Sequence, residues 1–460
     1  MFKGVFILLL HFYCKIVICT ECGKVWLTVS SLWRPIAASD KVVDAELEVN
    51  WDIDCASDLE YPDTIKVFAA DPAHNKTQKP DLILSSLEYP RGYYRTNITV
   101  GRPPLPGGWD TKDGATLPGP HCLKHHAGLY KDDVLLSSAC LRIWPTWMYD
   151  LRNKLGRLPI GSLMIPGTHN SGCYKHGDLT RRDAFQRHLL TQDRDVWTQL
   201  VHGIRYLDIR VGYYPSIPNG TVIEEDEEDN DHLNRFWVNH DVIRITPLSV
   251  IINDVISFLN VARGEVVIMD FHRFPVGFEG RPSRHKRLAN LLHQEFGDLI
   301  LKLDRGVEGL GPTLNDIWSG GSRLIICYGD KQTAGEYDWM WPPMTQAWGD
   351  QQTAEGLLQY LKDVITGPKK IRNSRNSFSQ NPLWAVMAEL TACPLDIIFN
   401  PSSGGLRQMA DSVNRLLTHE FQKEWWEETN IVATDYFLGN NLIDVSIQSN
   451  IKKSNIAQWQ

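Results

Sequence analysis

Apolar and polar positions follow two different patterns along the chain, and the change comes near residue 150. Before it, short stretches alternate apolar with polar side chains or are rich in β-branched residues, as half-buried strands do. Turn clusters rich in Pro and Gly separate them, and no helical period of useful length appears. We therefore predict a β-rich N-terminal domain over residues 23–148, of small β-sandwich type. The predicted strands include 24–30, 45–53 and 64–69.

After residue 150 the pattern becomes strand, loop and helix, repeated. Thr246 and Pro247 are suited to cap and begin one of the helices. Seven or so apolar strands with helices between them predict an α/β fold, a single (β/α) barrel over residues 150–445, followed by a C-terminal tail over 446–460. A doubly wound open sheet is the alternative. The predicted strands are 161–166, 204–211, 236–239, 265–270, 323–327, 383–387 and 430–434, and the helices are 193–201, 248–259, 284–296, 351–364 and 405–426.

Composition and charge narrow the class of protein. With 460 residues, 43% of them hydrophobic and 22% charged, the chain has the composition of a packed globular protein. Its net charge of −8 gives no basic field, so we expect no nucleic-acid partner. No Gly-rich phosphate fingerprint follows any predicted strand, which argues against a dinucleotide cofactor. Seven acidic residues fall within 224–231, and this run is typical of a solvated loop that an anionic bilayer would repel.

The N-terminal segment predicts the compartment. Lys3 precedes an apolar run that resumes through residues 16–18, a pattern typical of a signal peptide over residues 1–20. An N-terminal core strand is the alternative, because His11 and Lys15 interrupt the run. No later stretch is apolar for long enough to span a membrane. We expect a secreted protein, with which the glycosylation sequons at Asn75, Asn97 and Asn219 are compatible.

Nine cysteines suit a secreted protein with disulfides rather than a disulfide-dense miniprotein. Four of the seven that follow the predicted cleavage site precede residue 150, so the N-terminal region is the expected place for a disulfide. Cys122 lies among His121, His125 and His126, which could be read as part of a zinc site. No second Cys/His pair follows at finger spacing, because Cys140 stands alone, and a disulfide with surface histidines is the favoured reading.

Ionisable and polar side chains recur where five of the predicted strands end. In a (β/α) barrel these ends meet at one rim, where the active site is built. Five polar ends converging on one rim favour a functional site over capped turns. The residues are His169 and Asn170, then Asp208 and Arg210, then Asn239 and His240, then Asp270 and His272, and last Asp435.

Two histidines with one arginine suit displacement at a phosphodiester. One histidine can accept a proton from the attacking hydroxyl while the other donates to the leaving oxygen, and an arginine fork can bind the phosphate oxygens. A metal site is the competing interpretation, because Asn170, Asp208, His240 and Asp270 are all possible ligands. Arg210 in the middle of this set argues against a divalent cation.

Four blocks in order resemble the X domain of phosphatidylinositol-specific phospholipase C, and most closely the X-domain-containing group without accessory domains. The blocks are Ile165-Pro-Gly-Thr-His-Asn-Ser-Gly172, Gly203-Ile-Arg-Tyr-Leu-Asp-Ile-Arg210, Asn239-His240 and Glu265-Val-Val-Ile-Met-Asp-Phe271. The resemblance covers roughly residues 150–445 and leaves out the β-rich N-terminal region. It implies a distorted TIM-type barrel and hydrolysis of a phosphoinositide-like lipid, or of the lipid anchor of a surface protein, through a cyclic inositol phosphate.

The resemblance also implies roles for individual residues. His169 matches the general base and His240 the general acid, while Asp435 matches the carboxylate that orients the base. Arg210 matches the arginine of metal-independent bacterial members, with Asp208 at the neighbouring acidic position.

The substrate headgroup is expected to contact the remaining polar side chains of the rim. These candidates are Asn170, Asp270, His272 and Glu389, although a rim residue that meets solvent is an equal reading for Glu389.

One residue departs from the bacterial pattern. Bacterial members carry Asp after the first catalytic histidine, whereas this chain has Asn170, as the calcium-dependent animal enzymes do. We expect no cofactor, because Asn170 and Asp208 alone would hold Ca²⁺ poorly; if calcium does bind, these two are its expected ligands.

The lipid substrate implies a membrane surface as the partner. The aromatic stretch from Tyr337 to Trp348 is a candidate for that contact, and a packed loop core is the alternative.

Two other functions stay open on the sequence. A metal-dependent glycerophosphodiesterase barrel begins with His-Arg-Gly and a Glu-x-Asp pair, which are missing from the matching strands here. A lipid- or phosphate-binding protein with weak catalysis on the same barrel is opposed by the presence of both histidines and Arg210, and favoured by Asn170 and the acidic run.

Overall fold

The computed structural model describes residues 23–35, 42–43, 45–55, 61–75, 77–85, 89–174, 186–215, 235–303, 309–367, 381–393 and 404–457. The predicted signal peptide, the acidic run 224–231 and the sequon at Asn219 lie outside them. The chain divides into two compact units. One comprises residues up to 26, 50–93 and 125–139, and the other comprises 27–49, 94–124 and all residues from 140 onward.

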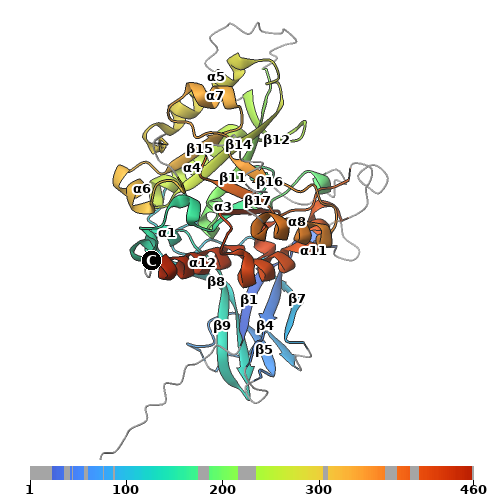
Figure 1. Cartoon of the computed structure of the whole chain (residues 1–460). Coiled ribbons are helices and arrows are strands. Elements are labelled where there is room, and N and C mark those ends of the chain that lie inside the picture. Colours follow the sequence, from blue (N-terminus) through green and yellow to red (C-terminus); the bar gives the residue numbers. More distant parts are fainter. Residues whose placement is uncertain are drawn as a thin grey trace, which may run out of the picture. The chain divides into compact units, whose positions relative to one another are not determined.

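Strands make up the N-terminal part, as its alternating pattern predicts (Figure 1), and the pairs β2–β3, β5–β6 and β5–β8 are antiparallel. They form a three-stranded sheet in the order β1-β4-β7, a four-stranded sheet in the order β6-β5-β8-β9, and the two-stranded β2-β3. The packing of these sheets as a sandwich, and a domain boundary at 148, stay predictions. The strands are β1 Lys24–Val29, β2 Arg34–Pro35, β3 Val42–Val43, β4 Glu46–Asp52, β5 Thr64–Phe68, β6 Leu82–Ser85, β7 Arg91–Thr99, β8 His121–Lys131 and β9 Val134–Ile143.

A disulfide joins Cys122 of β8 to Cys140 of β9, with 5.7 Å between their Cα atoms. The zinc reading of this cluster is therefore wrong, and the disulfide is confirmed, because a bridged sulfur no longer offers a thiolate to a metal. The expected surface position is wrong for two of the histidines, because His125 and His126 are only 7% and 9% exposed.

The second unit has a mixed α/β fold in which the last parallel strand of the chain, β18, lies beside the first, β10, and the other parallel strands continue in chain order from them. The hydrogen-bonded order is β16-β17-β18-β10-β11-β14-β15. The sheet is curled, and among the described residues no ladder joins its edge strands β15 and β16, so a closed barrel stays a prediction. The strands are β10 Ile165–Thr168, β11 Tyr206–Tyr213, β12 Phe236–His240, β13 Ile243–Pro247, β14 Val267–Val276, β15 Leu324–Tyr328, β16 Thr345–Ala347, β17 Trp384–Met387 and β18 Ile431–Thr434.

Helices lie alongside this sheet (Figure 1). The predicted segments 284–296, 351–364 and 405–426 correspond to α5, α8 and α11, the last of which continues into a π-helical turn at Phe421–Trp425. The helices are α1 Trp147–Asp150, α2 Arg152–Leu155, α3 Val196–His202, α4 Leu248–Val261, α5 Pro282–Phe296, α6 Leu314–Gly320, α7 Lys331–Glu336, α8 Ala354–Thr366, α11 Gly405–Glu420 and α12 Leu442–Ala457. None of the described helices has the length and hydropathy of a membrane-spanning segment.

Alternate side chains of the parallel strands enter two different cores. Ala385 and Met387 of β17 pack in one cluster with Ile431 of β18, whereas Val386 and Val432 pack in another together with residues of α8 and α11. A strand that is buried on both faces has a nearly continuous run of apolar residues, which is why these strands could be predicted from the sequence.

Three local features differ from the sequence-based expectation. Strand β12 runs antiparallel to β11 and forms a hairpin with β13, so it is not a parallel barrel strand. Thr246 does not cap α4: it lies in β13 and donates a hydrogen bond from Oγ1 to the carbonyl of Gly172. Most of the expected tail 446–460 belongs to α12. Ile447 and Asn450 of this helix are buried, so the segment is part of the folded unit.

Candidate active site

His169 and Asp435 meet because they follow neighbouring parallel strands. β10 and β18 are in register up to Thr168 and Thr434, so the next residue of each strand lies side by side. His169 Nδ1 is 2.7 Å from Asp435 Oδ1, and both side chains are buried. A carboxylate only accepts hydrogen bonds, so Nδ1 carries the proton and donates it. The unprotonated nitrogen of a neutral His169 is then Nε2, the atom that could act as a base.

Arg210 and Glu389 approach that second nitrogen. Arg210 Nη2 lies 2.7 Å from His169 Nε2, and the Glu389 carboxylate lies 3.8 Å from it. Burial by itself would lower the pKa of His169, but the carboxylates of Glu389 and Asp435 outweigh it and raise that pKa. The base candidate is therefore an imidazole with a carboxylate near each of its nitrogens.

Asp208 holds the arginine in place. Its Oδ2 accepts hydrogen bonds from Arg210 Nη2 at 3.2 Å and from the backbone N–H of Asn170 at 2.9 Å, while Gln346 Nε2 donates to Oδ1 at 3.3 Å. Burial alone would raise the pKa of Asp208, but the charges of Arg210 and the neighbouring histidines lower it to about 2. Asp208 is thus ionised, and its hydrogen bond orients the guanidinium of Arg210. A phosphate could approach that guanidinium from the side that does not face Asp208.

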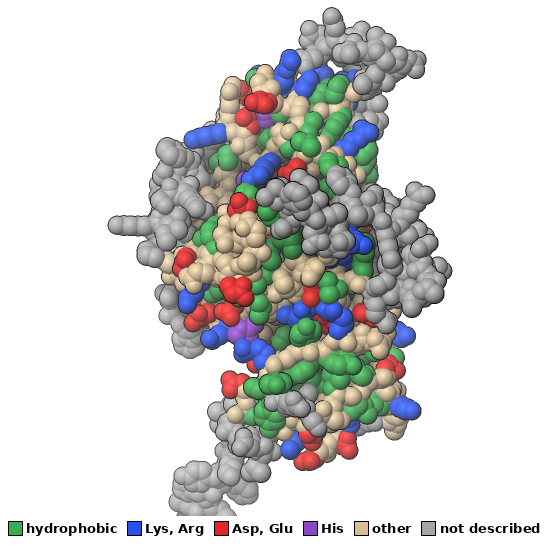
Figure 2. All heavy atoms as spheres, turned by 90° about the vertical axis from the view of Figure 1, so that its right-hand side faces the viewer, with side chains coloured by type: hydrophobic (Ala, Val, Ile, Leu, Met, Phe, Trp, Pro, Cys, Tyr) green, Lys and Arg blue, Asp and Glu red, His purple; other side chains and the backbone are tan. Residues whose placement is uncertain are grey.

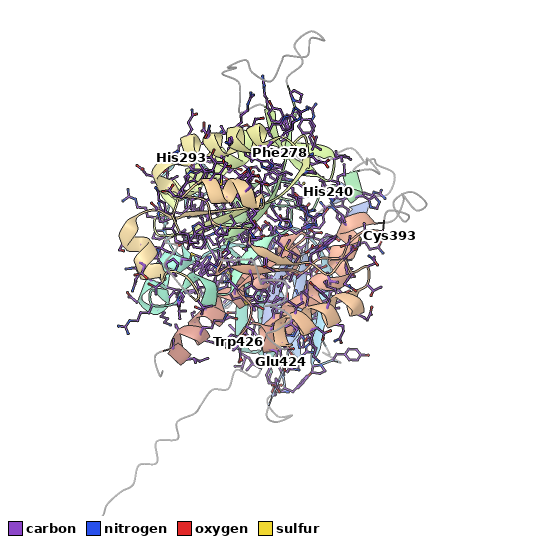
Figure 3. The ribbon with its side chains drawn as sticks, turned by 45° about the horizontal axis from the view of Figure 1, so that its top comes forward. His240, Phe278, His293, Cys393, Glu424 and Trp426 are labelled. Atoms are coloured by element: carbon purple, nitrogen blue, oxygen red, sulfur yellow. A yellow bond between two sulfur atoms is a disulfide. The ribbon has the colours of Figure 1, made fainter. Side chains whose placement is uncertain are left out.

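The hairpin brings His240 to the same place. One edge of β11 pairs with β14 along its length, so β10 and β12 share the other edge. Because β12 is antiparallel to β11, its C-terminal end lies nearest to the end of β10. His240, labelled in Figure 3, ends β12, and its Nδ1 lies 2.9 Å from the carbonyl of Leu189. Burial lowers the pKa of His240, and the charges of His169 and Arg210 lower it further. The two histidines therefore have pKa values shifted in opposite directions.

A left-handed backbone turn follows each of these chemically important residues. Asn170 has φ +39°, Asp241 has +48° and Tyr436 has +47°. Such conformations cost about 1–3 kcal/mol for residues other than glycine and cluster at functional sites. Here they turn the chain sharply just after His169, His240 and Asp435.

The predicted substrate residues are brought close to this centre. Asp270 lies opposite Asp208 in the β11–β14 register, and its Oδ2 accepts hydrogen bonds from Tyr206 and Gln346, both at 2.9 Å. Burial, and then the charge of Asp208, raise the pKa of Asp270 to about 7. His272 lines a cavity together with Arg210, and burial lowers its pKa to about 4.

Glu389 lies two residues beyond β17 and is only 4% exposed, so its reading as a rim residue that meets solvent is wrong. Neither carboxylate oxygen has a hydrogen-bond partner among the described residues. Burial raises the pKa of Glu389 to about 7. A buried acceptor pair without donors is costly unless a ligand supplies them.

The donor set does not fit a calcium ion. Asn170 Oδ1 is buried and has no hydrogen-bond partner in the described part of the chain, but Asp208 already accepts from the guanidinium of Arg210, whose charge would repel a cation. Within this unit, no three His, Cys, Asp or Glu side chains of the described residues lie at ligand distance from one another. Calcium takes six to eight oxygens, which this arrangement does not supply.

Sequence reasoning missed two glutamines and a tyrosine. Gln346 of β16 donates hydrogen bonds to both Asp208 and Asp270. The hydroxyl of Tyr206, at the start of β11, donates one to Asp270. Gln192 Nε2 donates to the carbonyls of His169 and Thr434, at 3.0 and 2.9 Å. An isolated glutamine carries no pattern, and β16 has only three residues, so the sequence offered no signal for either amide.

The aromatic stretch proposed for membrane contact is mostly core. Trp339 and Trp341 are 4% and 0% exposed, and Trp341 donates from its indole N–H to the carbonyl of Leu301. Of its aromatic side chains only Trp348, at 37%, is exposed. The packed-loop reading is therefore correct for most of this stretch.

An open cavity of about 570 Å³ adjoins the site. Its lining includes Arg210, Asp241, His272, Arg273 and Phe274. Arg210 lines this cavity and lies 2.7 Å from His169, so the cavity is next to the candidate base.

Comparison with known proteins supports the predicted resemblance. A PI-PLC X domain-containing protein 1 from Mus musculus is 27% identical over 239 residues, which is 47% of this chain and 63% of that protein. The Homo sapiens protein of the same name is 27% identical over 47% of this chain and 67% of its own length, and human PI-PLC X domain-containing protein 3 is 22% identical over 49% and 70%. The resemblance to proteins of this name is thus confirmed over about half the chain. No family model matches.

Solved phosphatidylinositol-specific phospholipases C are similar to the structure at low identity. The protein from Listeria monocytogenes has a TM-score of 0.45 and 20% identity, with 67% of this chain and 97% of that chain covered. The Staphylococcus aureus protein has a TM-score of 0.45 and 14% identity, with 66% and 97% covered.

Proposed function

We propose that the chain is a secreted phosphoric diester hydrolase that acts on phosphatidylinositol-type lipids at a membrane surface. The observation that carries the proposal is the imidazole of His169, bound to Asp435 through one nitrogen and facing Arg210 through the other. The similarity to proteins named for the PI-PLC X domain supports the choice of substrate class.

In this proposal the two histidines divide the proton transfers. His169 accepts the proton of the inositol hydroxyl next to the phosphate, and the oxygen attacks phosphorus to form a cyclic phosphate. His240 donates a proton to the departing diacylglycerol oxygen. Arg210, oriented by Asp208, offsets the charge on the nonbridging oxygens. Asp435 keeps His169 in the tautomer that leaves Nε2 basic.

The headgroup would be held by the remaining polar side chains. Asn170, Asp270, His272 and Glu389 are the proposed contacts, and the open acceptor oxygens of Glu389 suit hydroxyl donors. No metal is proposed, because Arg210 supplies the positive charge that a cation would otherwise bring.

A substrate series with different leaving groups tests the division of roles. On phosphatidylinositol, we expect His240→Ala to lower kcat by about 10²–10⁴. On an inositol nitrophenyl phosphodiester the loss should be much smaller, because nitrophenolate leaves without a proton. His169→Ala should lose its activity on both substrates. Equal losses of His240→Ala on the two substrates would contradict the assignment of the general acid.

Two alternatives fit fewer observations. A catalytically weak lipid- or phosphate-binding protein would bind as well with His169→Ala as with the wild-type chain. A metal-dependent glycerophosphodiesterase would lose its activity in a chelator, and the donor set around Asp208 argues against it.

A further inference from the structure

One short segment of the chain contacts both candidate histidines. The carbonyl of Leu189 lies 2.9 Å from His240 Nδ1, and Gln192 donates from Nε2 to the carbonyl of His169 at 3.0 Å. A carbonyl only accepts hydrogen bonds, so His240 donates through Nδ1, and Nε2 is the nitrogen left to protonate a leaving oxygen. The positions of both imidazoles therefore depend on residues 189–193, the bridging segment.

Arg407 of α11 holds the end of the bridging segment. Its guanidinium donates to both carboxylate oxygens of Asp193 and, through Nη1, to the carbonyl of Ser31 at 3.0 Å. The guanidinium carbon lies 4.2 Å from the ring centroid of Trp33 and 4.5 Å from that of Tyr436. Figure 2 shows Lys, Arg, Asp and Glu side chains interspersed at the surface of the face that it views, whereas Arg407 is only 4% exposed. A buried bidentate pair fixes the geometry of its partners, which a solvent-exposed pair does not.

A second connection passes through the strand end that carries Asp435. The buried amide Nδ2 of Asn414, also in α11, lies 3.2 Å from the carbonyl of Asp435 and 3.3 Å from the hydroxyl oxygen of Ser31. Tyr436, the next residue after Asp435, donates from its hydroxyl to the carbonyl of Leu190 in the bridging segment. Ser31 thus contacts two side chains of α11, and each of these contacts a group that holds a histidine.

Ser31 and Trp33 come from the β-rich N-terminal part of the sequence, between β1 and β2. They fold in the same compact unit as the candidate site. Arg102, from the same part of the sequence and the same unit, donates from Nη2 to the carbonyl of Asp193 at 2.9 Å. The N-terminal part therefore helps to hold the bridging segment, directly through Arg102 and indirectly through Arg407.

We propose that Arg407 is a positioning residue for both histidines, and that the N-terminal part is needed for the reaction because Ser31 and Trp33 place Arg407. The effect travels through Asp193 and the bridging segment, so Arg407 is not itself a catalytic residue. The inference rests on the proposed function, since it concerns the placement of the base and the acid of that reaction. The competing interpretation is a purely structural role, in which these contacts contribute to stability alone.

Arg407→Lys separates the two interpretations. Lysine keeps a positive charge beside Asp193, but a single ammonium does not reproduce the fork that binds Asp193 and Ser31 together. On a monomeric short-chain phosphatidylinositol we expect kcat to fall by about ten- to a hundredfold at unchanged KM, because displaced reacting groups slow the chemical step without weakening binding. A kcat equal to that of the wild type, with only a lower melting temperature, would overturn the proposal.

Trp33→Ala tests the N-terminal contribution and leaves every charge in place. It removes one of the rings beside the guanidinium of Arg407, and we expect kcat to fall by about fivefold. Trp26→Ala is the matched control, because Trp26 of β1 is also half-buried but belongs to the other compact unit. Equal values of kcat in the two variants would contradict a specific role of Trp33.

Nitrogen NMR of the imidazoles reports the placement of His240 without any turnover. In the wild-type chain the carbonyl of Leu189 selects the tautomer of neutral His240 that carries its proton on Nδ1. We expect Arg407→Lys to shift the His240 signals toward the mixture of tautomers that a free imidazole adopts. An unchanged tautomer in this variant would contradict the coupling between Arg407 and the acid.

The coupling and the proposed function can fail separately. A His240 tautomer that depends on Arg407, in a chain that does not hydrolyse phosphatidylinositol, would keep the coupling and refute the enzyme. Hydrolysis with a kcat and a tautomer that Arg407→Lys leaves unchanged would keep the enzyme and refute the coupling.

Discussion

The two candidate histidines differ in the charges that surround them. His169 has the carboxylates of Asp435 and Glu389 near its two nitrogens, and its pKa is raised; His240 is buried near Arg210 and His169, and its pKa is lowered. A base must be neutral and an acid protonated at the start of the reaction. The active form, with His169 neutral and His240 protonated, is therefore the minor protonation state of the pair. The rate depends on pH in a bell-shaped curve, whose two apparent pKa values belong to the pair as a whole.

Glu389→Gln should move the basic limb of that profile. The carboxylate of Glu389 stabilises protonated His169, so its removal lowers the pKa of His169. In a pair that is active in its minor protonation state the higher apparent pKa is that of the base, so we expect the basic limb of kcat/KM to shift to lower pH. The measurement is the pH profile of the variant and of the wild-type chain, with Glu355→Gln on the exposed surface of α8 as the control. A basic limb that stays in place, or moves to higher pH, would show that Glu389 does not act on the base.

At the scale of elements, the parallel strands were predictable because both of their faces are buried. Largely apolar runs predicted β11, β14, β15, β17 and β18, and polar residues at the strand ends predicted most of the candidate site. The run 161–166 overlaps β10 only at Ile165 and Pro166, because Ile160–Ser162 forms a 3₁₀ turn. The sequence could not show that β12 is antiparallel, since pairing depends on partners distant in the chain. It also could not show that Glu389 is buried, or that Gln346 connects Asp208 to Asp270.

Gln192 connects the strand ends that carry His169 and Asp435, and it gives the prediction at this scale. Gln192→Leu leaves the buried carbonyl of His169 without the amide donor and that of Thr434 with only the backbone N–H of His169, which should cost about 1–3 kcal/mol of stability. Because the His169–Asp435 contact depends on those strand ends, kcat should also fall.

Denaturant unfolding and kcat measure the two effects of Gln192→Leu. Gln359→Leu is the control, because Gln359 makes its hydrogen bond to Asp363 on the exposed side of α8 and should contribute less than about 0.5 kcal/mol. If the two substitutions destabilise the protein equally, the hydrogen bonds of Gln192 contribute no more to stability than that of the exposed Gln359.

On the scale of the whole molecule, sequence similarity covers about half of the chain, and the candidate site lies within the α/β unit. The β-rich N-terminal part was predicted as strands and contains the Cys122–Cys140 disulfide, and the four sequence blocks that carry the resemblance all follow it in the chain. Secretion, the domain boundaries and the closure of the barrel remain predictions. The central claim for the molecule is hydrolysis by two histidines and an arginine without a metal.

Incubation of the purified full chain with phosphatidylinositol vesicles in EDTA tests that claim most directly. The products to measure are diacylglycerol and water-soluble inositol phosphate, with His169→Ala in parallel. We predict that the wild type forms both products in EDTA and that the variant forms neither. Product that appears only after Ca²⁺ is added would contradict metal independence, and equal product from His169→Ala would contradict the role of His169 as the base.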